Sequence, residues 1–301
     1  MEVTHPERVV FPDDGITKGE VVAYYTKVAS RMLPFIEGRA LSVERFPQGI
    51  GGKGFMQKNA PDHYPEDLIG RHELPKEGGG TTVYPVVNTS EGIEFFANFG
   101  AITFHVPSIR IVDEDHPDWV IWDLDPPPER VALVREAAVA MRSFLEGYGI
   151  PTVLLASGSK GYHLRARLRP GLDLEAVARI ARGTAELAVA SHEELLTVAF
   201  RKADREERVF VDWMRNTGRS TSVAPWSLRP RSGAPVAAPL AWEELTSVEP
   251  DGIQLRGVDA RMDVDPWSAL KPIDLTSVLE HVDRDLTDAG IELEPFDRFR
   301  S

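Results

Sequence analysis

Two aspartates, Asp123 and Asp125, close the apolar run Trp119-Val-Ile-Trp-Asp-Leu-Asp. In an extended strand alternate side chains point to the same face, so the two carboxylates lie side by side. Carboxylates at this spacing repel each other unless a cation lies between them, and their hard oxygen atoms suit Mg²⁺ or Mn²⁺. The prolines at 126–128 end the strand and place the pair at the rim of a sheet. The simpler alternative is a solvated Asp-x-Asp at a strand end.

A third carboxylate, Asp212, follows the apolar residues of Val209-Phe-Val-Asp-Trp. A carboxylate at this point would be costly in a core without a partner. Three carboxylates from two strands are what two-metal phosphoryl transfer requires, with two bridging both ions and the third completing the site. The sequence therefore predicts that Asp123, Asp125 and Asp212 bind two divalent metal ions.

A predicted hairpin over residues 153–168 has the turn Ser157-Gly-Ser-Lys-Gly. Small residues, free backbone N–H groups and one cation can together hold a phosphate. The turn is not a Walker loop, because its spacing differs and no helix follows it. The returning strand places His163, Arg165 and Arg167 on one face, which suits a triphosphate pocket. The alternative is a solvated face of an antiparallel sheet.

Other segments could contact a nucleotide or a nucleic acid. Arg229 in Ala-Pro-Trp-Ser-Leu-Arg and Arg205 are candidates for phosphate or base contacts, or are surface arginines. Phe55-Met-Gln-Lys58 combines a stacking surface with a cation, and core packing is the alternative for Phe55. A histidine between apolar residues, as His105 is, more often forms a hydrogen bond in a core than binds a ligand.

Periodicity predicts the elements that must position these residues. A helix over 16–37 has Thr17 as candidate N-cap with Glu20 three residues later, and a short helix from Gly92 is predicted to lead into Phe104-His-Val. Further helices are predicted over 129–148, 173–190 and about 274–288. Strands are predicted over 40–46, 55–58, 81–87, 119–125, 153–156, 162–168 and 209–213. The pattern predicts an α+β fold in which mixed or antiparallel sheets are flanked by helices.

Composition limits the class of protein. Among 301 residues there is no apolar run near the roughly 18 needed to cross a membrane, nor a signal-peptide pattern, so we expect a cytoplasmic protein. The absence of cysteine excludes disulfides, thiol catalysis and zinc fingers, and no zinc is expected. The net charge of −13 argues against a nucleic-acid partner, but the residues from Ala241 onward carry −9 of it. Residues 201–231 hold eight basic and four acidic side chains, so a local field for a polyanion remains available.

Together these residues resemble the polymerase domain of bacterial ATP-dependent DNA ligase D, in the archaeo-eukaryotic primase superfamily. The similarity runs from Arg8-Val-Val-Phe-Pro to about Leu245. Its most specific parts, in the family's order and spacing, are Trp122-Asp-Leu-Asp-Pro, Ser157-Gly-Ser-Lys-Gly-Tyr-His-Leu, Val209-Phe-Val-Asp-Trp and Ala224-Pro-Trp-Ser-Leu-Arg. The resemblance implies one primase-polymerase domain over 1–301. Within it, 1–107 would contact DNA and a 5′-phosphate, 108–240 would form the catalytic core, and the acidic segment 241–301 would pack on that core.

The resemblance implies a template-capable nucleotidyltransferase that extends primers at gaps or breaks, prefers ribonucleotides, and acts in end joining or excision repair. It implies Mn²⁺ or Mg²⁺ as cofactor and NTP or dNTP as substrate. Gapped or broken DNA with a 5′-phosphate is the implied partner, with Ku and a DNA ligase as further candidates. We expect a monomer, with no membrane association, in the bacterial cytoplasm at the nucleoid.

The resemblance also implies roles for individual residues. Asp123, Asp125 and Asp212 match a catalytic, metal-binding triad. Residues that match the surroundings of the incoming nucleotide are His105, Ser157, Gly158, Ser159, Lys160, His163 and Arg229. Residues that match DNA-binding positions are Arg8 and Lys18 at the 5′-phosphate of a gap, Phe55 and Lys58 at the template and downstream DNA, Arg205 on a loop that meets the template, and Arg45.

The chain departs from the family pattern at three places. Met56 stands where a second aromatic is common, Arg8 stands where lysine is common, and Ser220, preceded by Arg219, replaces a further common lysine. These changes concern the grip on DNA and not the catalytic core. The residues leave two alternatives to a polymerase: a non-catalytic DNA-end or gap-binding module, and an Asp-x-Asp phosphotransferase or glycosyltransferase. The sequence does not decide between a stand-alone protein and an excised domain.

Overall fold

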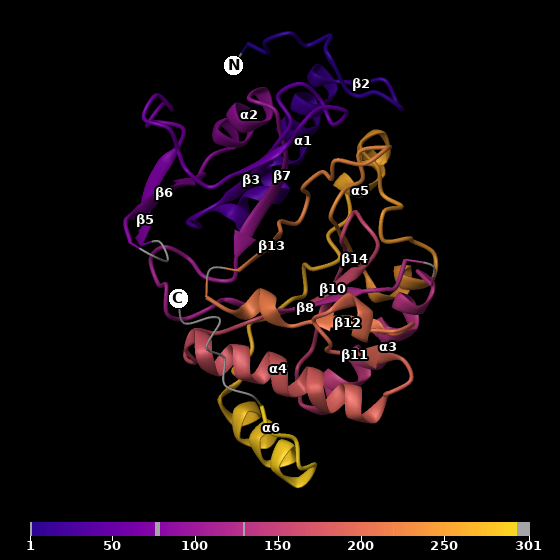
Figure 1. Cartoon of the computed structure of the whole chain (residues 1–301). Helices are drawn as coiled ribbons and strands as arrows, with labels where there is room; N and C mark the ends of the chain where they lie inside the picture. Colours follow the sequence, from indigo (N-terminus) through magenta and orange to yellow (C-terminus); the bar gives the residue numbers. More distant parts are fainter. Residues whose placement is uncertain (1, 76–78, 129, 219, 294–301) are drawn as a thin grey trace. The chain divides into compact units, whose positions relative to one another are not determined.

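The computed structural model describes residues 2–75, 79–128, 130–218 and 220–293, which form two compact units (Figure 1). The first unit contains the residues up to Val112 together with Thr221–Ala238 and Asp251–Asp265. The second contains Asp113–Ser220, Pro239–Pro250 and the residues from Pro266 on. The chain therefore returns to the first unit twice after leaving it.

A six-stranded sheet of order β11-β12-β8-β10-β9-β14 organises the second unit. Strands β12, β8, β10 and β9 pair antiparallel in succession, and β11 pairs parallel with β12. The mixed sheet confirms the predicted α+β class. Its strands are β8 (Trp119–Asp125), β9 (Val153–Ala156), β10 (Tyr162–Arg167), β11 (Leu196–Thr197), β12 (Val209–Asp212) and β14 (Ala238–Leu240).

Alternation along the strands gives this sheet one apolar and one polar face. Trp122, Leu164 and Val211 are buried in a cluster with the apolar sides of α3 (Leu133–Gly147) and α4 (Leu174–Ser191), which lie on this face (Figure 1). The intervening residues, which include all three predicted catalytic aspartates, point to the opposite face. The helices therefore cover the apolar face of the sheet, and the three aspartates lie on the face that α3 and α4 do not cover.

Part of the acidic C-terminal segment packs on the second unit through α6 (Thr276–Asp288), whereas its residues Asp251–Asp265 belong to the first unit. Val282 and Leu286 are buried against α4, and Gly183 allows the close approach. A Cβ atom at Gly183 would lie 2.4 Å from a methyl group of Val282. The predicted helix over about 274–288 is thus present, and its apolar side covers α4.

A four-stranded antiparallel sheet of order β13-β7-β3-β4 forms the centre of the first unit, and α1 contacts α2 beside it. Helix α1 begins with the predicted capping box: Glu20 N–H donates to Thr17 Oγ1 (3.3 Å), and Thr17 N–H donates to Glu20 Oε2 (2.9 Å). The elements of this unit are β1 (Val9–Phe11), β2 (Ile16–Thr17), α1 (Lys18–Ile36), β3 (Ser42–Arg45), β4 (Phe55–Gln57), β5 (Gly70–Pro75), β6 (Thr81–Val86), α2 (Ser90–Asn98), β7 (Ala101–Pro107), β13 (Thr221–Val223) and α5 (Asp259–Met262).

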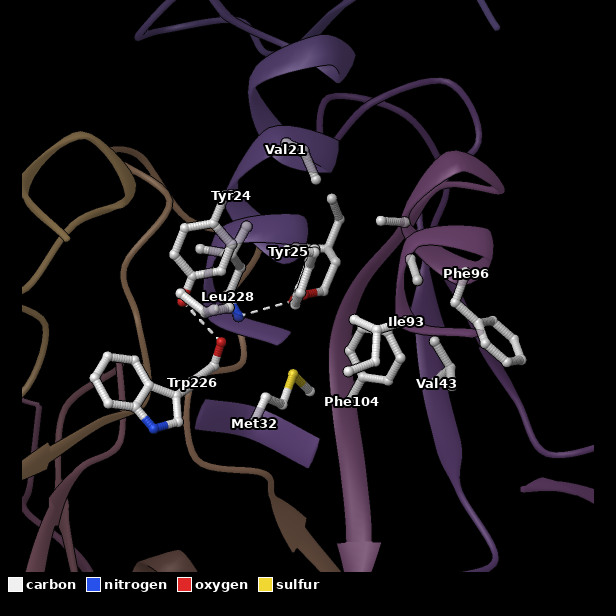
Figure 2. Packing of buried hydrophobic residues seen from close by; sticks show 14 of the residues in the cluster. Val21, Tyr24, Tyr25, Met32, Val43, Ile93, Phe96, Phe104, Trp226 and Leu228 are labelled. Atoms are coloured by element: carbon white, nitrogen blue, oxygen red, sulfur yellow. Dashed lines mark hydrogen bonds between the residues drawn. The ribbon is translucent and has the colours of Figure 1, made fainter. Parts of the chain in front are cut away.

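Figure 2 shows how the returning segment 221–238 joins the core of the first unit. The Tyr24 hydroxyl donates to the Trp226 carbonyl (2.7 Å), and Leu228 N–H donates to the Tyr25 hydroxyl (3.0 Å). Trp226 has a φ of +70°, which non-glycine residues rarely adopt. The two tyrosines satisfy the backbone at this strained turn and so fix the residue that follows it, Arg229.

One predicted element was wrong in extent, and besides β5 the short strands β1, β2, β11, β13 and β14 were not predicted. The helix from Gly92 was expected to run to Phe104, but α2 ends at Asn98 and residues from Ala101 form β7. Gly100, with a φ of +83°, ends the helix because the left-handed conformation favours glycine. Strand β5 was missed. No helix in the described part of the chain is both long and apolar enough to span a bilayer.

Candidate active site

Strands β8 and β12 bring the three predicted catalytic acids together. Their antiparallel register pairs Asp212 directly with Asp123, and Asp125 lies two residues further along the same face of β8. Asp123 and Asp212 are buried, whereas Asp125 is half-buried. Carboxylates from two strands therefore meet on one face, as the sequence predicted.

A cation supplied by the chain itself lies between two of these acids. Arg215 Nε is 3.2 Å from Asp123 Oδ2, and its Nη2 is 3.0 Å from Asp212 Oδ2. The sequence analysis counted Arg215 only among the basic residues of 201–231 and gave it no role. Its separation of three residues from Asp212 was an available signal, because a 3₁₀ turn brings side chains at that spacing to the same side.

The turn that carries this arginine is fixed by hydrogen bonds to the active strands. Ile121 N–H donates to Asn216 Oδ1 (2.8 Å), and Asn216 Nδ2 donates to the Ile121 carbonyl (2.7 Å). Met214 N–H donates to Asp212 Oδ1 (2.9 Å). The buried Asn216 carboxamide thus bonds both backbone groups of Ile121 on β8, in the way that a residue of a paired strand does. Asn216 was not among the predicted site residues.

His163 contacts Asp123 from the other side. It is the cross-strand partner of Asp123 on β10, and its Nε2 lies 3.2 Å from Asp123 Oδ1. The ring is buried, and its Nδ1 has no hydrogen-bond partner in the described part of the chain. Asp123 is therefore held between a histidine and an arginine.

These surroundings give the three carboxyls different acidities. Burial tends to raise the pKa of Asp123, but His163 and Arg215 outweigh burial and hold that pKa below its ordinary value. Burial, then the charges of Asp123 and Asp212, raise the pKa of Asp125 to about 7. Burial also raises the pKa of Asp212, against the opposing charge of Arg215. Asp125 is thus the carboxyl whose charge the protein leaves least compensated.

A divalent cation fits these donors by chemistry, although the side chains are not arranged around one. Among the described residues, no group of three or more His, Asp or Glu side chains is placed to hold a metal ion. The Arg215 guanidinium contacts one oxygen of Asp123 and one of Asp212. Carboxylates are the ligands that Mg²⁺ and Mn²⁺ prefer. The pKa of Asp125 is raised partly by the negative charges of Asp123 and Asp212, and a bound cation would offset this repulsion. Metal binding at all three carboxylates would therefore require Arg215 to withdraw.

The predicted phosphate-binding turn at 157–161 lies against the end of β8. A Cβ atom at Gly161 would lie 1.9 Å from the Leu124 carbonyl oxygen, so only glycine allows this approach. Lys160 is exposed on the same turn. The close contact places a cation near the strand that carries Asp123 and Asp125.

The expectation of free backbone N–H groups in this turn was wrong. Ser159 and Gly161 N–H groups donate to Ser157 Oγ (3.2 and 3.3 Å), and Gly158 N–H donates to the Pro250 carbonyl (2.8 Å). Ser157 N–H donates to the Gly161 carbonyl (3.1 Å). These bonds engage four of the five backbone N–H groups of the turn, three of them within the turn, so contact with a phosphate falls mainly to side chains.

The remaining two nucleotide-binding candidates belong to the first unit. His105 lies half-buried on β7, opposite Ser42 and Val223. Arg229 follows the buried Leu228, and its N–H donates to the Pro235 carbonyl (2.8 Å). Their contact with a nucleotide stays a prediction.

Arg8 and Lys18 line a cavity of about 170 Å³ in the first unit. Lys18 Nζ donates to the carbonyl and the hydroxyl of Thr4 (both 2.6 Å), and Arg8 Nη1 donates to the Pro47 carbonyl (2.8 Å). Burial, followed by the nearby charge of Arg8, lowers the pKa of Lys18. Two cations at one small cavity suit a phosphate group.

The other DNA-binding candidates lie in both units. Arg45 and Phe55 are cross-strand partners on β3 and β4, and Lys58 is exposed just after β4. In the second unit, the guanidinium carbon of Arg205 lies 3.6 Å from the ring centre of Phe210. Burial lowers the pKa of Arg205, against the charges of Asp125 and Asp212. The chain departs from the family pattern at Arg219 and Ser220. Arg219 lies outside the described residues. Ser220 Oγ lies 3.2 Å from Thr217 Oγ1.

Comparison with known proteins shows the family to which the chain belongs. Residues 17–267 match the family described as LigD, primase-polymerase domain. The multifunctional non-homologous end joining protein LigD of Mycolicibacterium smegmatis is 33% identical over 91% of this chain and 36% of that protein. The bifunctional non-homologous end joining protein LigD of Bacillus subtilis is 28% identical over 82% of this chain and 40% of its own length.

Among solved structures, the polymerase domain from Mycobacterium tuberculosis Ligase D in complex with DNA matches with a TM-score of 0.78. The two chains are 31% identical, and the match covers 95% of each. The present chain thus spans little more than a third of the curated relatives but nearly the whole of this solved domain.

Proposed function

Because the chain belongs to the LigD primase-polymerase domain family, a family of nucleotidyltransferases, we propose that it extends primers at the site formed by Asp123, Asp125 and Asp212. A primer 3′-hydroxyl attacks the α-phosphate of a bound nucleotide and pyrophosphate departs. The observation that carries the proposal is the register that sets Asp212 opposite Asp123, with Asp125 on the same face. Family membership favours this reaction over a phosphotransferase, a glycosyltransferase or a non-catalytic DNA-end module.

The three carboxylates would hold two Mg²⁺ or Mn²⁺ ions. When bound, such ions activate the attacking hydroxyl and neutralise charge on the leaving group. Arg215 keeps Asp123 and Asp212 compensated until it withdraws, and His163 orients Asp123. Lys160 supplies a positive charge for the outer phosphates of the nucleotide. In this proposal, Arg215 and His163 hold the carboxylates in place before the substrate binds.

From the family resemblance, His105 and Arg229 are proposed to contact the sugar and the triphosphate of a nucleotide. A preference for ribonucleotides is also proposed. Its only support is the family resemblance. The loop that carries Arg205 is proposed to meet the template strand. Arg205 and Asp125 influence each other electrostatically, which supports a place for this loop beside the catalytic acids.

The cavity with Arg8 and Lys18 is proposed to bind the 5′-phosphate at the far side of a gap. Its support is the pair of cations at a small cavity, together with the DNA complex formed by the structurally similar tuberculosis domain. The names of the relatives support a role in non-homologous end joining. Ku and a DNA ligase as partners, and a cytoplasmic place of action, complete the proposal.

Primer extension tests the proposal. A duplex with a short gap and a 5′-phosphate is incubated with labelled ATP or dATP and Mn²⁺, and product length is followed on a denaturing gel. Asp125→Asn should reduce the rate by at least a hundredfold, whereas Asp288→Asn, at an exposed carboxylate on α6, should extend normally. Equal rates for wild type and Asp125→Asn would overturn the site assignment, and no extension by wild type would overturn the function.

A further inference from the structure

Two exposed phenylalanines from different elements flank one arginine in the first unit. Phe55 on β4 is 46% exposed, and Phe99, directly after α2, is 39% exposed. The Arg45 guanidinium carbon lies 5.4 Å from the ring centre of Phe55 and 6.0 Å from that of Phe99. Met56, the next residue of β4, is 45% exposed, and its side chain points to the opposite face of the strand. The sequence analysis gave Phe99 no role.

Arg45 is engaged by the protein and acts as a support for the two rings. Its Nε and Nη2 donate to the Phe99 carbonyl (2.9 and 2.5 Å). Its Nη1 donates to Gln57 Oε1 (2.6 Å) and to the Tyr64 hydroxyl (3.1 Å). These bonds tie β3, β4 and the end of α2 together at the point where the two rings emerge.

The Phe99 ring is itself fixed from one side. It stacks on Phe95 with ring centres 4.4 Å apart and an angle of 27° between the planes, and Tyr64 meets it edge-on at 6.0 Å. The next residue, Gly100, is in the left-handed conformation and lies against the backbone of Pro47. A ring that is stacked on one side and substantially exposed offers a rigid surface to a further aromatic group.

Phe99 also lines the cavity that holds Arg8 and Lys18. The aromatic surface and the cationic cavity therefore meet at this one residue. Scattered exposed apolar side chains need no explanation, but an exposed aromatic ring at a cavity lined by two cations matches the two chemical parts of a nucleotide. A protein partner would have no need for both features at one point.

We propose that Phe99, supported by Arg45 and adjoined by Phe55, stacks on the 5′-terminal base of the strand whose 5′-phosphate binds at Arg8 and Lys18. This inference rests on the proposed function, since that strand borders the gap being filled. Phe99 supplies from the end of α2 a second aromatic ring, which the sequence lacks at Met56. The site is thereby selective for a phosphorylated end that still carries its base.

Fluorescence anisotropy at fixed salt, with a labelled gapped duplex, tests the inference. Two duplexes are compared, both with a 5′-phosphate at the gap, one with a normal 5′-terminal nucleotide and one with an abasic tetrahydrofuran residue there. Wild type should bind the first about tenfold more tightly, which is about 1.4 kcal/mol and within the range of base–aromatic stacking. Phe99→Leu should bind both duplexes at the weaker level, and Phe99→Tyr, which keeps the ring, should behave as wild type.

The controls separate this inference from the proposed function. Lys18→Ala, measured on gapped duplexes with and without the 5′-phosphate, should lose the preference for the phosphate. Wild type with no preference for a 5′-phosphate would overturn the gap-binding function. The stacking role alone would be overturned if wild type prefers the 5′-phosphate and Phe99→Leu still discriminates against the abasic end as wild type does. An equal loss on both duplexes in Phe99→Leu would also overturn it.

Discussion

Replacing Asp125 by asparagine should stabilise the protein in the absence of metal while removing its response to metal. Burial and the charges of Asp123 and Asp212 raise the pKa of Asp125 from its ordinary value of 3.8 to about 7. A carboxyl whose pKa is raised on folding contributes stability that is fully present below about pH 4 and is lost as the pH rises through about 7. Ionised Asp125 is therefore a cost to the folded state at pH 8.

The size of this cost can be bounded. At about 1.4 kcal/mol for each unit of difference in pKa, the rise to about 7 sets a ceiling of about 4 kcal/mol. Asp125 is half-buried, and screening by solvent reduces the effect, so we expect about 1–2 kcal/mol. At about 2 °C per kcal/mol for a protein of this size, Asp125→Asn should raise the Tm by about 2–4 °C at pH 8 in EDTA. The gain at pH 5 should be smaller, because Asp125 is then largely protonated in the folded state.

Differential scanning fluorimetry at pH 5 and pH 8 measures both effects, with Asp288→Asn as the matched control. Addition of Mn²⁺ at pH 8 should raise the Tm of wild type and of Asp288→Asn, because binding to the folded state stabilises it. The Tm of Asp125→Asn should change little. The reasoning is refuted if Asp125→Asn gives no gain at pH 8, or if its gain is as large at pH 5.

Three further changes have expected outcomes. Asp123→Asn should have the opposite sign from Asp125→Asn, lowering the unfolding free energy at pH 7 by about 3 kcal/mol because Arg215 loses a buried partner; a Tm equal to that of wild type would contradict this. Gly161→Ala should lower both the Tm and the rate of primer extension, since its Cβ would lie 1.9 Å from the Leu124 carbonyl oxygen; normal activity would show that the turn can move away from β8. Lys18→Ala should weaken binding to 5′-phosphorylated gaps about tenfold, as expected for loss of a charged hydrogen bond, and a gel-shift titration in which its affinity equals that of wild type would exclude the cavity as the phosphate site.

Local patterns were sufficient to predict much of the fold. The capping box of Thr17 and Glu20, and the alternation of His163 with Leu164 on β10, depend on neighbours a few residues away, and the structure has both. The end of α2 was misplaced because apolar residues continue through Gly100 into Phe104, and the pattern does not show that Gly100 takes a positive φ. The return of segment 221–238 to the first unit depends on contacts with Tyr24 and Tyr25, just over two hundred residues earlier.

The candidate site was predictable where chemistry and strand geometry coincide. Asp123, Asp125 and Asp212 could be identified because acids at the ends of apolar strands are unusual, and pairing then set Asp212 beside Asp123. The only signal for Arg215 was its separation of three residues from Asp212, and this signal is weak because its contacts depend on a short turn held by Asn216. Phe99 was missed for a related reason: its exposure and its place beside Arg8 and Lys18 arise only in the folded unit.

The most direct test of the central claim is a count of the Mn²⁺ ions that the three carboxylates bind. Electron paramagnetic resonance of free Mn²⁺, during titration at pH 8 with a non-hydrolysable nucleotide present, measures the number bound to each chain. Wild type and Asp288→Asn should each bind two ions, and Asp125→Asn and Asp212→Asn should each bind fewer and more weakly. Equal numbers and affinities in all four proteins would contradict the assignment of these aspartates as the metal-binding catalytic site.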